Sequence, residues 1–383
     1  MRVAFLCKRQ YMGKDVIVDR YARLYEFPRQ LARLGHDVRC FCLSYQRHEE
    51  GEWEHEAGSA NGRLRWESRS LGRLILPGLA RYPAHVLHRL RAFEPEMLIG
   101  ASDIPHAILA QWLARRLRTP YAIDLYDNFE GFGQARIPGM IAALRRALRQ
   151  AALVTTTSEL LKERVETVYR ATGKVLALPS AIDGDVFYPQ DKATCRRALG
   201  LPPDAPLVGT AGGLLRARGI DALYDAWPQV AAKRPAARLV LAGPVDKNLP
   251  PPRREDVIYL GSLPHRDTAL LFNAIDVGVI YLKDTSFGRY CFPQKAYEML
   301  ACRLPIVAAG VGAMPALLGD PRSLYRVDDS ASLAHAILAN LDMPVISDRE
   351  VLDWEGIGTN LERHLREACN THGPLPLEAH RHD

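Results

Sequence analysis

Residues 292–310, FPQKAYEMLACRLPIVAAG, combine the start of a helix with the buried strand that follows it. Pro293 suits a first helical turn, the helical pattern ends near Arg303, and LPIVAAG is typical of an apolar strand. Short runs rich in Val, Ile and Leu alternate in the same way with helical patterns along almost the whole chain. This alternation predicts an α/β protein whose parallel sheets are joined by crossover helices.

The first turns of that helix carry an amide, a cation and a carboxylate. Gln294 and Lys295 precede Glu298 by four and three residues, so the three side chains project from one side. The N–H groups of a helix start and an ammonium bind phosphate, while a carboxylate accepts from two adjacent ribose hydroxyls. The pattern suits a nucleotide diphosphate, although a solvated ion pair between Lys295 and Glu298 fits the same spacing.

The periodicity predicts two series of strands and helices. The predicted strands are residues 2–7, 38–43, 97–101, 120–125, 152–156, 174–178, 206–211, 238–243, 256–261, 277–281, 304–309 and 323–327. The predicted helices lie near residues 20–35, 79–93, 104–118, 137–151, 158–170, 219–233, 264–275, 293–302, 312–318, 330–341 and 350–368. The polar segment 44–62 is interpreted as a mobile loop, and Pro28 predicts a kink or a late start in the first helix.

The length predicts two domains, because 383 residues exceed the size at which a single core usually keeps growing. A segment bracketed by Pro, Gly and Asp at 178–189 interrupts the pattern and is interpreted as the hinge. We therefore expect an N-terminal domain over 1–183, a C-terminal domain over 184–346, a terminal helix within 347–370 and a disordered tail over 371–383. Open parallel sheets bind ligands beyond the carboxyl ends of their strands, so we expect a central cleft between two doubly wound domains.

The composition is that of a globular enzyme, with 48% apolar and 25% charged residues. No segment approaches the roughly 18 apolar residues of a membrane span, and residues 1–8 are too short an apolar run for a signal peptide. We expect a cytoplasmic protein. The seven cysteines are scattered, without CxxC pairs or His partners at ligand spacing, so the sequence predicts reduced, structural thiols and no metal site.

The formal charge of +6 is unevenly distributed. Residues 61–150 contain 14 Arg and seven acidic residues, which leaves the rest of the chain close to neutral. Such a basic face suits an anionic membrane surface or a lipid-linked phosphate acceptor, and a solvated Arg-rich helix surface explains it equally well. Nucleic acid is not expected, because the arginines are not interleaved with aromatic residues.

A second polar cluster follows the strand predicted at 206–211. Gly212 and Gly213 permit close approach of a ligand, and Arg218 stands just before the next helix, where it can contact phosphate. A tight strand–helix turn without a ligand explains the same glycines.

An ordered series of motifs links these clusters. It consists of GHDV at 35–38, TTSE at 156–159, the LP…ID…F pattern at 178–187, RGID at 218–221, LAGP at 241–244, GSLP at 261–264, AIDV at 274–277, the segment 295–308, and Trp354-Glu355 at the start of a terminal helix. The series resembles family 4 glycosyltransferases of the GT-B fold over nearly the whole chain. The resemblance implies two Rossmann-like domains, of which the first (1–183) is the acceptor-side domain and the second (184–346) binds the nucleotide-sugar donor, and a terminal helix that crosses back onto the first.

By this resemblance the chain moves a sugar from a nucleotide diphosphate sugar, for which we expect uridine, to an acceptor hydroxyl with retention of configuration and without a metal or another cofactor. Protein cations would then stabilise the leaving diphosphate, with Arg218 and Lys295 in that catalytic role and Glu298 on the ribose. The expected donor-binding residues are Gly13, Gly212, Gly213, Arg216, Arg218, Tyr290, Pro293, Lys295 and Glu298.

The chain departs from the family pattern at four of its positions. Gly213 stands where the family usually has Arg, and Arg218 stands where it has Lys, so one of two cations is missing. Tyr290 replaces the first of two paired glutamates. Tyr126 stands where the family often has a His that assists at the reacting sugar.

The acceptor-side candidates follow predicted strands of the first domain: Asp103, Asp124, Tyr126 and Asp127. Asp127 lies beyond the strand and is the preferred catalytic carboxylate, because it can accept a hydrogen bond from an acceptor hydroxyl. Capping or loop-tip roles fit Asp124 and Asp127 as well. His106 is interpreted as a packing or capping residue.

Other functions fit parts of the pattern. A non-catalytic nucleotide-sugar-binding subunit would explain the missing Glu and His, and a nucleotide-sugar epimerase can share the fold. A dinucleotide oxidoreductase is disfavoured, because KRQYMG at 8–13 cannot form the GxGxxG turn. The expected partners are therefore a nucleotide-sugar donor and a glycan, lipid-linked or small-molecule acceptor.

Overall fold

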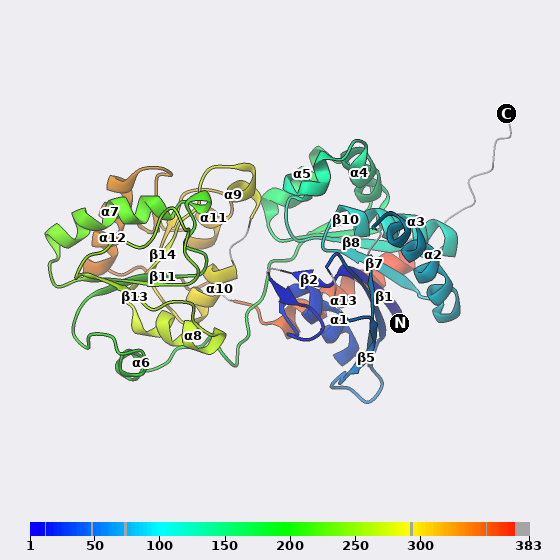
Figure 1. Cartoon of the computed structure of the whole chain (residues 1–383), viewed down its shortest axis with the longest axis horizontal. Coiled ribbons are helices and arrows are strands. Elements are labelled where there is room, and N and C mark those ends of the chain that lie inside the picture. The colour runs from blue at the N-terminus through cyan, green and yellow to red at the C-terminus, as the bar shows by residue number, and fades with distance from the viewer. Residues whose placement is uncertain (12, 47–48, 73–74, 292–293, 350, 372–383) are drawn as a thin grey trace. The chain divides into compact units, whose positions relative to one another are not determined.

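The computed structural model describes residues 1–371 except 12, 47–48, 73–74, 292–293 and 350. The chain forms two compact units, Met1–Pro179 together with the segment that begins at Trp354, and Ser180–Asp353 (Figure 1). We call them unit 1 and unit 2. The division falls shortly before the boundary expected at 183, and most of the expected tail lies outside the described residues.

The sheet of unit 1 has eight strands in the order β10-β9-β8-β7-β1-β4-β6-β5. They are β1 (Arg2–Lys8), β4 (Asp37–Ser44), β5 (Gly51–His55), β6 (Arg63–Ser70), β7 (Met97–Ala101), β8 (Tyr121–Leu125), β9 (Leu153–Thr156) and β10 (Lys174–Ala177). All neighbours pair in parallel except β5 and β6. The central strands are apolar and buried, as parallel strands covered by helices on both faces must be.

The edge of this sheet differs from the expectation. Segment 44–62, predicted to be a mobile loop, contains β5, and β6 was not predicted at all. In β5, exposed glutamates alternate with half-buried residues, and Trp53 pairs with Trp66 of β6. Edge strands carry charges that prevent further pairing, so their composition resembles that of a loop.

The helices of unit 1 are α1 (Ala22–Arg33), α2 (Ile75–Phe93), α3 (Ile104–Leu117), α4 (Met140–Gln150), α5 (Glu159–Thr167) and α13 (Trp354–Thr371). The connections β1–α1–β4 and β7–α3–β8 extend the sheet in opposite directions, and right-handed crossovers therefore place α1 and α3 on opposite faces (Figure 1). Pro28 lies inside α1, which begins at Ala22 and therefore does not start late.

Helix α13 packs against α1. A Cβ atom on Gly358 would lie 2.4 Å from Cβ of Gln30, so only glycine permits this approach. The rings of Phe27 and Trp354 are 6.4 Å apart, and Lys174 donates a 2.8 Å hydrogen bond to Glu367. Helix α13 is thus part of unit 1.

Unit 2 has a parallel six-stranded sheet in the order β13-β12-β11-β14-β15-β16. Its strands are β11 (Leu207–Ala211), β12 (Arg238–Ala242), β13 (Val257–Tyr259), β14 (Val277–Ile280), β15 (Ile306–Ala309) and β16 (Leu324–Tyr325). Its helices are α6 (Lys192–Ala198), α7 (Ile220–Lys233), α8 (His265–Ala274), α9 (Ser286–Tyr290), α10 (Gln294–Ala301), α11 (Met314–Leu318) and α12 (Ser330–Asp342). Helices α7 and α12 lie on one face of the sheet, and α6 and α8 lie on the other (Figure 1).

Two helices of unit 2 were not predicted. Both are short, and a side chain caps each of them: Asp191 accepts from the Thr194 N–H at 2.8 Å before α6, and Thr285 accepts from the Gly288 N–H at 3.2 Å before α9. Helices of one or two turns give too few repeats for periodicity to reveal them.

Each sheet reverses its strand order at one point, between β1 and β7 in unit 1 and between β11 and β14 in unit 2. In open parallel sheets, ligands bind beyond the carboxyl ends of the strands at such a switch point. No helix in the described part of the chain is both long and apolar enough to span a bilayer.

Candidate functional site

At the switch point of unit 2, a glycine turn after β11 lies beside a tyrosine that follows β14. Gly212 and Gly213 follow β11, and Tyr281 follows β14. The Tyr281 hydroxyl donates a 2.9 Å hydrogen bond to the carbonyl oxygen of Gly213. The turn between β11 and α7 is therefore held against the end of the neighbouring strand.

Glycine is required in this turn. Gly212 has φ +107°, and a Cβ on Gly243 would lie 2.1 Å from the carbonyl oxygen of Gly212. The Gly212 N–H donates to the Ala242 carbonyl at 2.9 Å, which continues the ladder between the two strands. Because Gly212 and Gly213 have no side chains, only backbone atoms line the outer side of the turn.

The ammonium of Lys295 occupies that outer side. A Cβ on Gly212 would lie 3.0 Å from the Lys295 Nζ, and this Nζ lies 5.2 Å from the centre of the Tyr281 ring. The pKa of Lys295 is lowered to about 8, chiefly by burial and also by the charge of Arg218, while Glu298 opposes the shift. The cation is thus held beside the turn at an energetic cost.

Glu298 follows one helical turn later on α10. Burial raises its pKa to about 7, and the charge of Lys295 only partly opposes that shift. Among the described residues no ion pair joins Lys295 to Glu298, so the solvated pair allowed by their spacing is not formed. Both groups remain partly exposed and available to a ligand.

Arg218 supplies a second cation. It ends a short 3₁₀ turn, Arg216–Arg218, before Gly219, whose φ of +101° starts α7. The guanidinium is half-buried, with its carbon 5.9 Å from the centre of the Phe287 ring, and forms no ion pair within the described part of the chain. Arg216 is exposed, and its backbone N–H donates to Asp246 at 3.3 Å.

Two further donor-side candidates are less well defined. Tyr290 is the last residue of α9 and is half-buried. Pro293 lies outside the described residues. The structure thus brings together Gly212, Gly213, Arg218, Lys295 and Glu298, and adds Tyr281 and Phe287, which the sequence analysis did not select.

Gly13 belongs to unit 1. It has φ +80° and is exposed in the turn of a hairpin between β2 (Gln10–Tyr11) and β3 (Lys14–Asp15). Nothing lies within 4 Å of the position of a Cβ on this glycine. Its φ angle, rather than close packing, accounts for glycine there.

On the carboxyl edge of unit 1, Asp124 is fully engaged inside the protein. Arg23 donates to both of its carboxylate oxygens at 2.7–3.0 Å, and the Thr155 hydroxyl donates to one at 2.7 Å. Arg23 and Asp124 are each 1% exposed. This buried pair ties α1 to β8, so Asp124 has a structural role rather than the acceptor-side role considered for it.

Asp103 is the N-cap of α3. It accepts from the His106 N–H at 3.1 Å, lies 2.6 Å from the His106 Nδ1, and accepts from the Tyr45 hydroxyl at 2.9 Å. Burial acts to raise the pKa of Asp103, but the charge and hydrogen bonds of His106 lower it overall. Both side chains are buried, which leaves Asp103 no face toward an acceptor.

Asp127 and Tyr126 remain partly exposed just beyond β8. Asp127 accepts a 2.7 Å hydrogen bond from the Asn128 N–H. Burial raises the pKa of Asp127, while that N–H and the charge of Lys8 oppose the shift. Tyr126 donates to the Ser102 carbonyl at 3.1 Å and accepts from Lys8 at 3.4 Å. Lys8 was not selected from the sequence.

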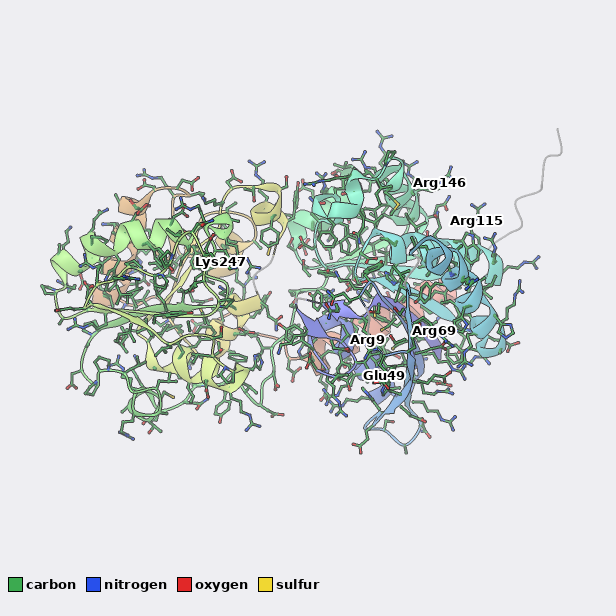
Figure 2. The ribbon with its side chains drawn as sticks, viewed as in Figure 1. Arg9, Glu49, Arg69, Arg115, Arg146 and Lys247 are labelled. Atoms are coloured by element: carbon green, nitrogen blue, oxygen red, sulfur yellow. The ribbon has the colours of Figure 1, made fainter. Side chains whose placement is uncertain are left out.

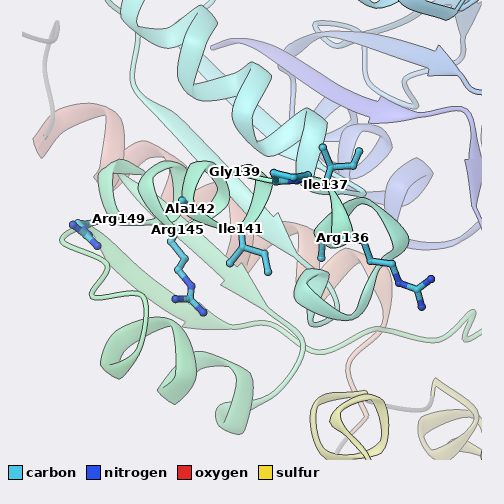
Figure 3. A pocket seen from close by; sticks show the side chains of 9 residues that line it. Arg136, Ile137, Gly139, Ile141, Ala142, Arg145 and Arg149 are labelled. Atoms are coloured by element: carbon cyan, nitrogen blue, oxygen red, sulfur yellow. The ribbon is translucent and has the colours of Figure 1, made fainter.

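The basic region of unit 1 gathers around α4. We call Arg136, Ile137, Ile141, Arg146 and Arg149 the α4 surface; it borders an open cavity of about 580 Å³ (Figure 3) and a second one of about 660 Å³. Ile137 is 55% exposed. The three arginines are exposed and have no acidic partner among the described residues, and Figure 2 marks Arg146 on α4. Arg145, in contrast, donates to Glu130 at 2.8 Å.

The described residues include no group of three or more His, Cys, Asp or Glu side chains that could hold a metal ion.

Family models match both units. The model described as "Glycosyl transferase 4-like domain" matches residues 22–181, and the one described as "Glycosyl transferases group 1" matches residues 205–343. The D-inositol 3-phosphate glycosyltransferase of Stackebrandtia nassauensis is 34% identical over an alignment of 205 residues that covers 49% of this chain and 45% of that protein. The chain thus spans about half the length of the curated relatives it matches.

Solved structures share the complete fold. Sucrose-phosphate synthase from Thermosynechococcus elongatus superposes with a TM-score of 0.68 at 19% identity, covering 98% of each chain. The Anabaena protein Alr3699/HepE, solved in complex with UDP, gives a TM-score of 0.71 at 17% identity, covering 96% of this chain and 100% of that one. At these identities the similarity establishes the architecture.

Proposed function

Because the chain belongs to the family 4 glycosyltransferases of the GT-B fold, we propose that it transfers a sugar from a nucleotide diphosphate sugar to an acceptor hydroxyl. Unit 2 binds the donor and unit 1 supplies the acceptor side. The observation that carries this proposal is the Lys295 ammonium beside the bare Gly212 turn at the switch point of unit 2, with Arg218 close enough to lower the pKa of Lys295.

The donor diphosphate binds along the outer side of the Gly212–Gly213 turn. Lys295 and Arg218 contact its oxygens, and both can do so because neither is neutralised by an ion pair among the described residues. Glu298 accepts hydrogen bonds from the ribose hydroxyls. A uridine nucleotide is supported by the UDP bound to the structurally similar Anabaena protein.

Cleavage of the bond between the sugar and the diphosphate leaves additional negative charge on the diphosphate. Lys295 and Arg218 stabilise this charge in a partly buried setting, where electrostatic interactions are stronger than in water. We propose retention of configuration and a metal-independent reaction, as the family resemblance implies, with these two cations in the role that a divalent ion has in other transferases.

The acceptor is a molecule with a sugar-like hydroxyl. Asp127 accepts the hydrogen bond of that hydroxyl, because it is the one carboxylate among the four acceptor-side candidates that remains partly exposed without an ion pair in the described part of unit 1. The name of the Stackebrandtia relative, an inositol 3-phosphate glycosyltransferase, supports a polyol or sugar acceptor.

We also propose that the α4 surface binds to an anionic membrane. The protein would then be cytoplasmic and peripherally bound to the inner face of that membrane. The three unpaired arginines of this surface attract anionic headgroups, and Ile137 and Ile141 supply apolar contact beside them. A lipid-linked acceptor would then be presented close to the enzyme.

A panel of nucleotides and nucleotide sugars tests the proposal. A ligand that binds the native state raises Tm, so UDP and UDP-sugars are expected to raise Tm more than other nucleotides and nucleotide sugars. Release of UDP from the best-binding UDP-sugar that depends on a candidate acceptor then identifies a transferase, whereas release without an acceptor shows hydrolysis of the donor. Binding without any turnover would favour a nucleotide-sugar-binding subunit, and interconversion of the sugar would favour an epimerase.

A further inference from the structure

A cavity of about 60 Å³ lies over the outer strands of the unit 1 sheet. Its charged lining residues are Arg39 of β4, Glu52 of β5, Arg65 and Glu67 of β6, and Arg89 of α2. Arg39 and Arg65 are each the third residue of their strands, close to the amino ends. Ligands of open parallel sheets bind beyond the carboxyl ends, so this cavity is separate from the switch point.

Strand register brings two of the arginines together. Arg39 stands opposite Arg65 in the parallel pair β4–β6, so both side chains lie on the same face of the sheet. Glu67 follows Arg65 by two residues and shares that face, and Arg89 reaches it from α2, 2.9 Å from the Glu67 carboxylate. Three guanidinium groups therefore gather around one small cavity.

The three cations are not equally neutralised. Arg65 donates to both carboxylate oxygens of Asp37, at 2.8 and 2.9 Å, and Arg89 donates to Glu52 at 2.7 Å. The Arg39 side chain, in contrast, forms no ion pair and donates no hydrogen bond within the described part of the chain. The buried Nε–H groups of Arg39 and Arg65 both lack an acceptor there. The cavity is thus bordered by N–H donors that the protein itself leaves without acceptors.

Charge and burial favour a negatively charged ligand here. Three cations and two carboxylates line the cavity, which leaves one positive charge unbalanced. Arg39 is half-buried, with its guanidinium carbon 4.5 Å from the centre of the Phe93 ring. Burial lowers the pKa of Arg39, and the charges of Arg65 and Arg89 also lower it, while two nearby carboxylates oppose the shift. An anion beside Arg39 would offset both the burial and the repulsion.

We propose that this cavity is a binding site for a free inorganic oxyanion, such as phosphate or sulfate, held by Arg39 and Arg65. The inference goes beyond the proposed glycosyl transfer and does not rest on it. A water molecule takes up about 30 Å³ of the liquid, so a cavity of about 60 Å³ admits a small anion but neither a sugar nor a nucleotide. Planar guanidinium groups donate to two oxygens of such an anion at once. The bound anion joins β4 to β6 and stabilises this edge of the sheet.

Thermal unfolding of the full chain in potassium phosphate and in potassium chloride of equal ionic strength tests the site. At ten times the Kd for phosphate, the wild-type Tm should rise by roughly 3–6 °C. Arg39→Gln removes the unpaired cation and should abolish this rise. Arg63→Gln, at an exposed arginine two residues before Arg65 that does not line the cavity, is the matched control and should keep it.

Equal rises in Tm for Arg39→Gln and the wild type, or no rise in the wild type, would overturn the inference. Should Arg39→Gln fail to fold, Arg39→Lys provides the second variant. It keeps the charge but lacks the planar fork, so it should still show a smaller rise than the wild type. A rise equal to that of the wild type in folded Arg39→Lys would count against bidentate binding by Arg39.

A second comparison separates this cavity from the donor site, where the Lys295 ammonium also attracts phosphate. Lys295→Met should keep the phosphate-dependent rise in Tm, and Arg39→Gln should bind UDP with the wild-type Kd. A rise that is lost in Lys295→Met and kept in Arg39→Gln would place the phosphate at the donor site and overturn the inference. Wild-type protein that binds no UDP would count against the proposed function alone.

The size of the ligand is tested with glucose 6-phosphate, which carries the same phosphate group on a hexose. Because the cavity does not admit the hexose, glucose 6-phosphate should raise the wild-type Tm less than inorganic phosphate does at the same concentration. A rise with glucose 6-phosphate but none with inorganic phosphate would overturn the assignment to a free anion.

Discussion

The hydroxyl of Tyr281 donates a 2.9 Å hydrogen bond to the carbonyl oxygen of Gly213 and thereby joins the ends of β14 and β11 at the switch point of unit 2. The same tyrosine ring lies 5.2 Å from the Lys295 ammonium. One side chain thus supports both the turn and the cation that we assign to the donor diphosphate.

Removing only the hydroxyl of Tyr281 should loosen this turn. A neutral hydrogen bond contributes about 0.5–1.5 kcal/mol, so Tyr281→Phe should weaken UDP binding by roughly twofold to tenfold. Calorimetric titration measures the change. Tyr188→Phe, at a side chain 48% exposed, is the control and should bind UDP like the wild type. Equal affinity of Tyr281→Phe and wild type would show that the turn is held without this hydrogen bond.

The sequence predicted the sheets of both units because their central strands are continuous apolar runs. It also predicted the glycine turn and the helix carrying Lys295 and Glu298, since both stand next to such strands. It missed β5, whose exposed glutamates alternate with half-buried residues at the sheet edge, and β6, in which arginines and Glu67 interrupt the apolar pattern. The pattern of apolar residues predicts buried strands, and neither β5 nor β6 is a continuous apolar run.

The functional groups of unit 1 were harder to predict. Asp103 and Asp124 were acceptor-side candidates beside the preferred Asp127, but Arg23 engages Asp124 and His106 engages Asp103 inside the protein. Arg23 and Asp124 are 101 residues apart, so no local pattern reveals their pairing. Lys8, whose ammonium donates to the Tyr126 hydroxyl, was missed as well, because only the sheet order brings the end of β1 close to residues that follow β7 and β8.

Binding of UDP should be linked to protons through Lys295. The native pKa of Lys295 is lowered to about 8, so the free enzyme is only partly protonated there at pH 8. A diphosphate favours the charged ammonium and raises its pKa, so UDP binding at pH 8 should take up protons, and affinity should fall as the pH rises further. Titrations in buffers of different ionisation enthalpy measure the uptake. Lys295→Met should lack most of it; uptake equal to wild type would assign the proton to another group.

Asp127 should affect transfer and not donor binding. Asp127→Asn keeps the size of the side chain and removes its charge, so the rate of transfer should fall at least tenfold while the Kd for UDP stays within about twofold. Rates and calorimetry on the same preparation give both numbers. A parallel loss of UDP affinity would remove Asp127 from the acceptor side.

The α4 surface should bind anionic vesicles in a salt-dependent way. Each arginine near an anionic bilayer contributes about 1 kcal/mol, so the double variant Arg146→Ser/Arg149→Ser should lower binding by roughly thirtyfold. Cosedimentation with mixed phosphatidylglycerol and phosphatidylcholine vesicles is the measurement. Arg253→Ser/Arg266→Ser, which removes two exposed arginines of unit 2, is the matched control. Binding that is absent in the wild type, or insensitive to salt, would contradict a membrane role.

Titration of UDP into wild type, Arg218→Ala and Glu298→Ala tests the central claim, that Arg218 and Glu298 hold one nucleotide at the unit 2 switch point. Hydrogen bonds to charged groups are worth about 1.5–3 kcal/mol, so each variant should bind UDP roughly tenfold to more than a hundredfold more weakly while Tm stays near that of the wild type. Glu298→Ala should also narrow the preference for UDP over its 2′-deoxy analogue, since the variant lacks the carboxylate that accepts from the ribose hydroxyls. Wild-type affinity for UDP in either folded variant would contradict the account.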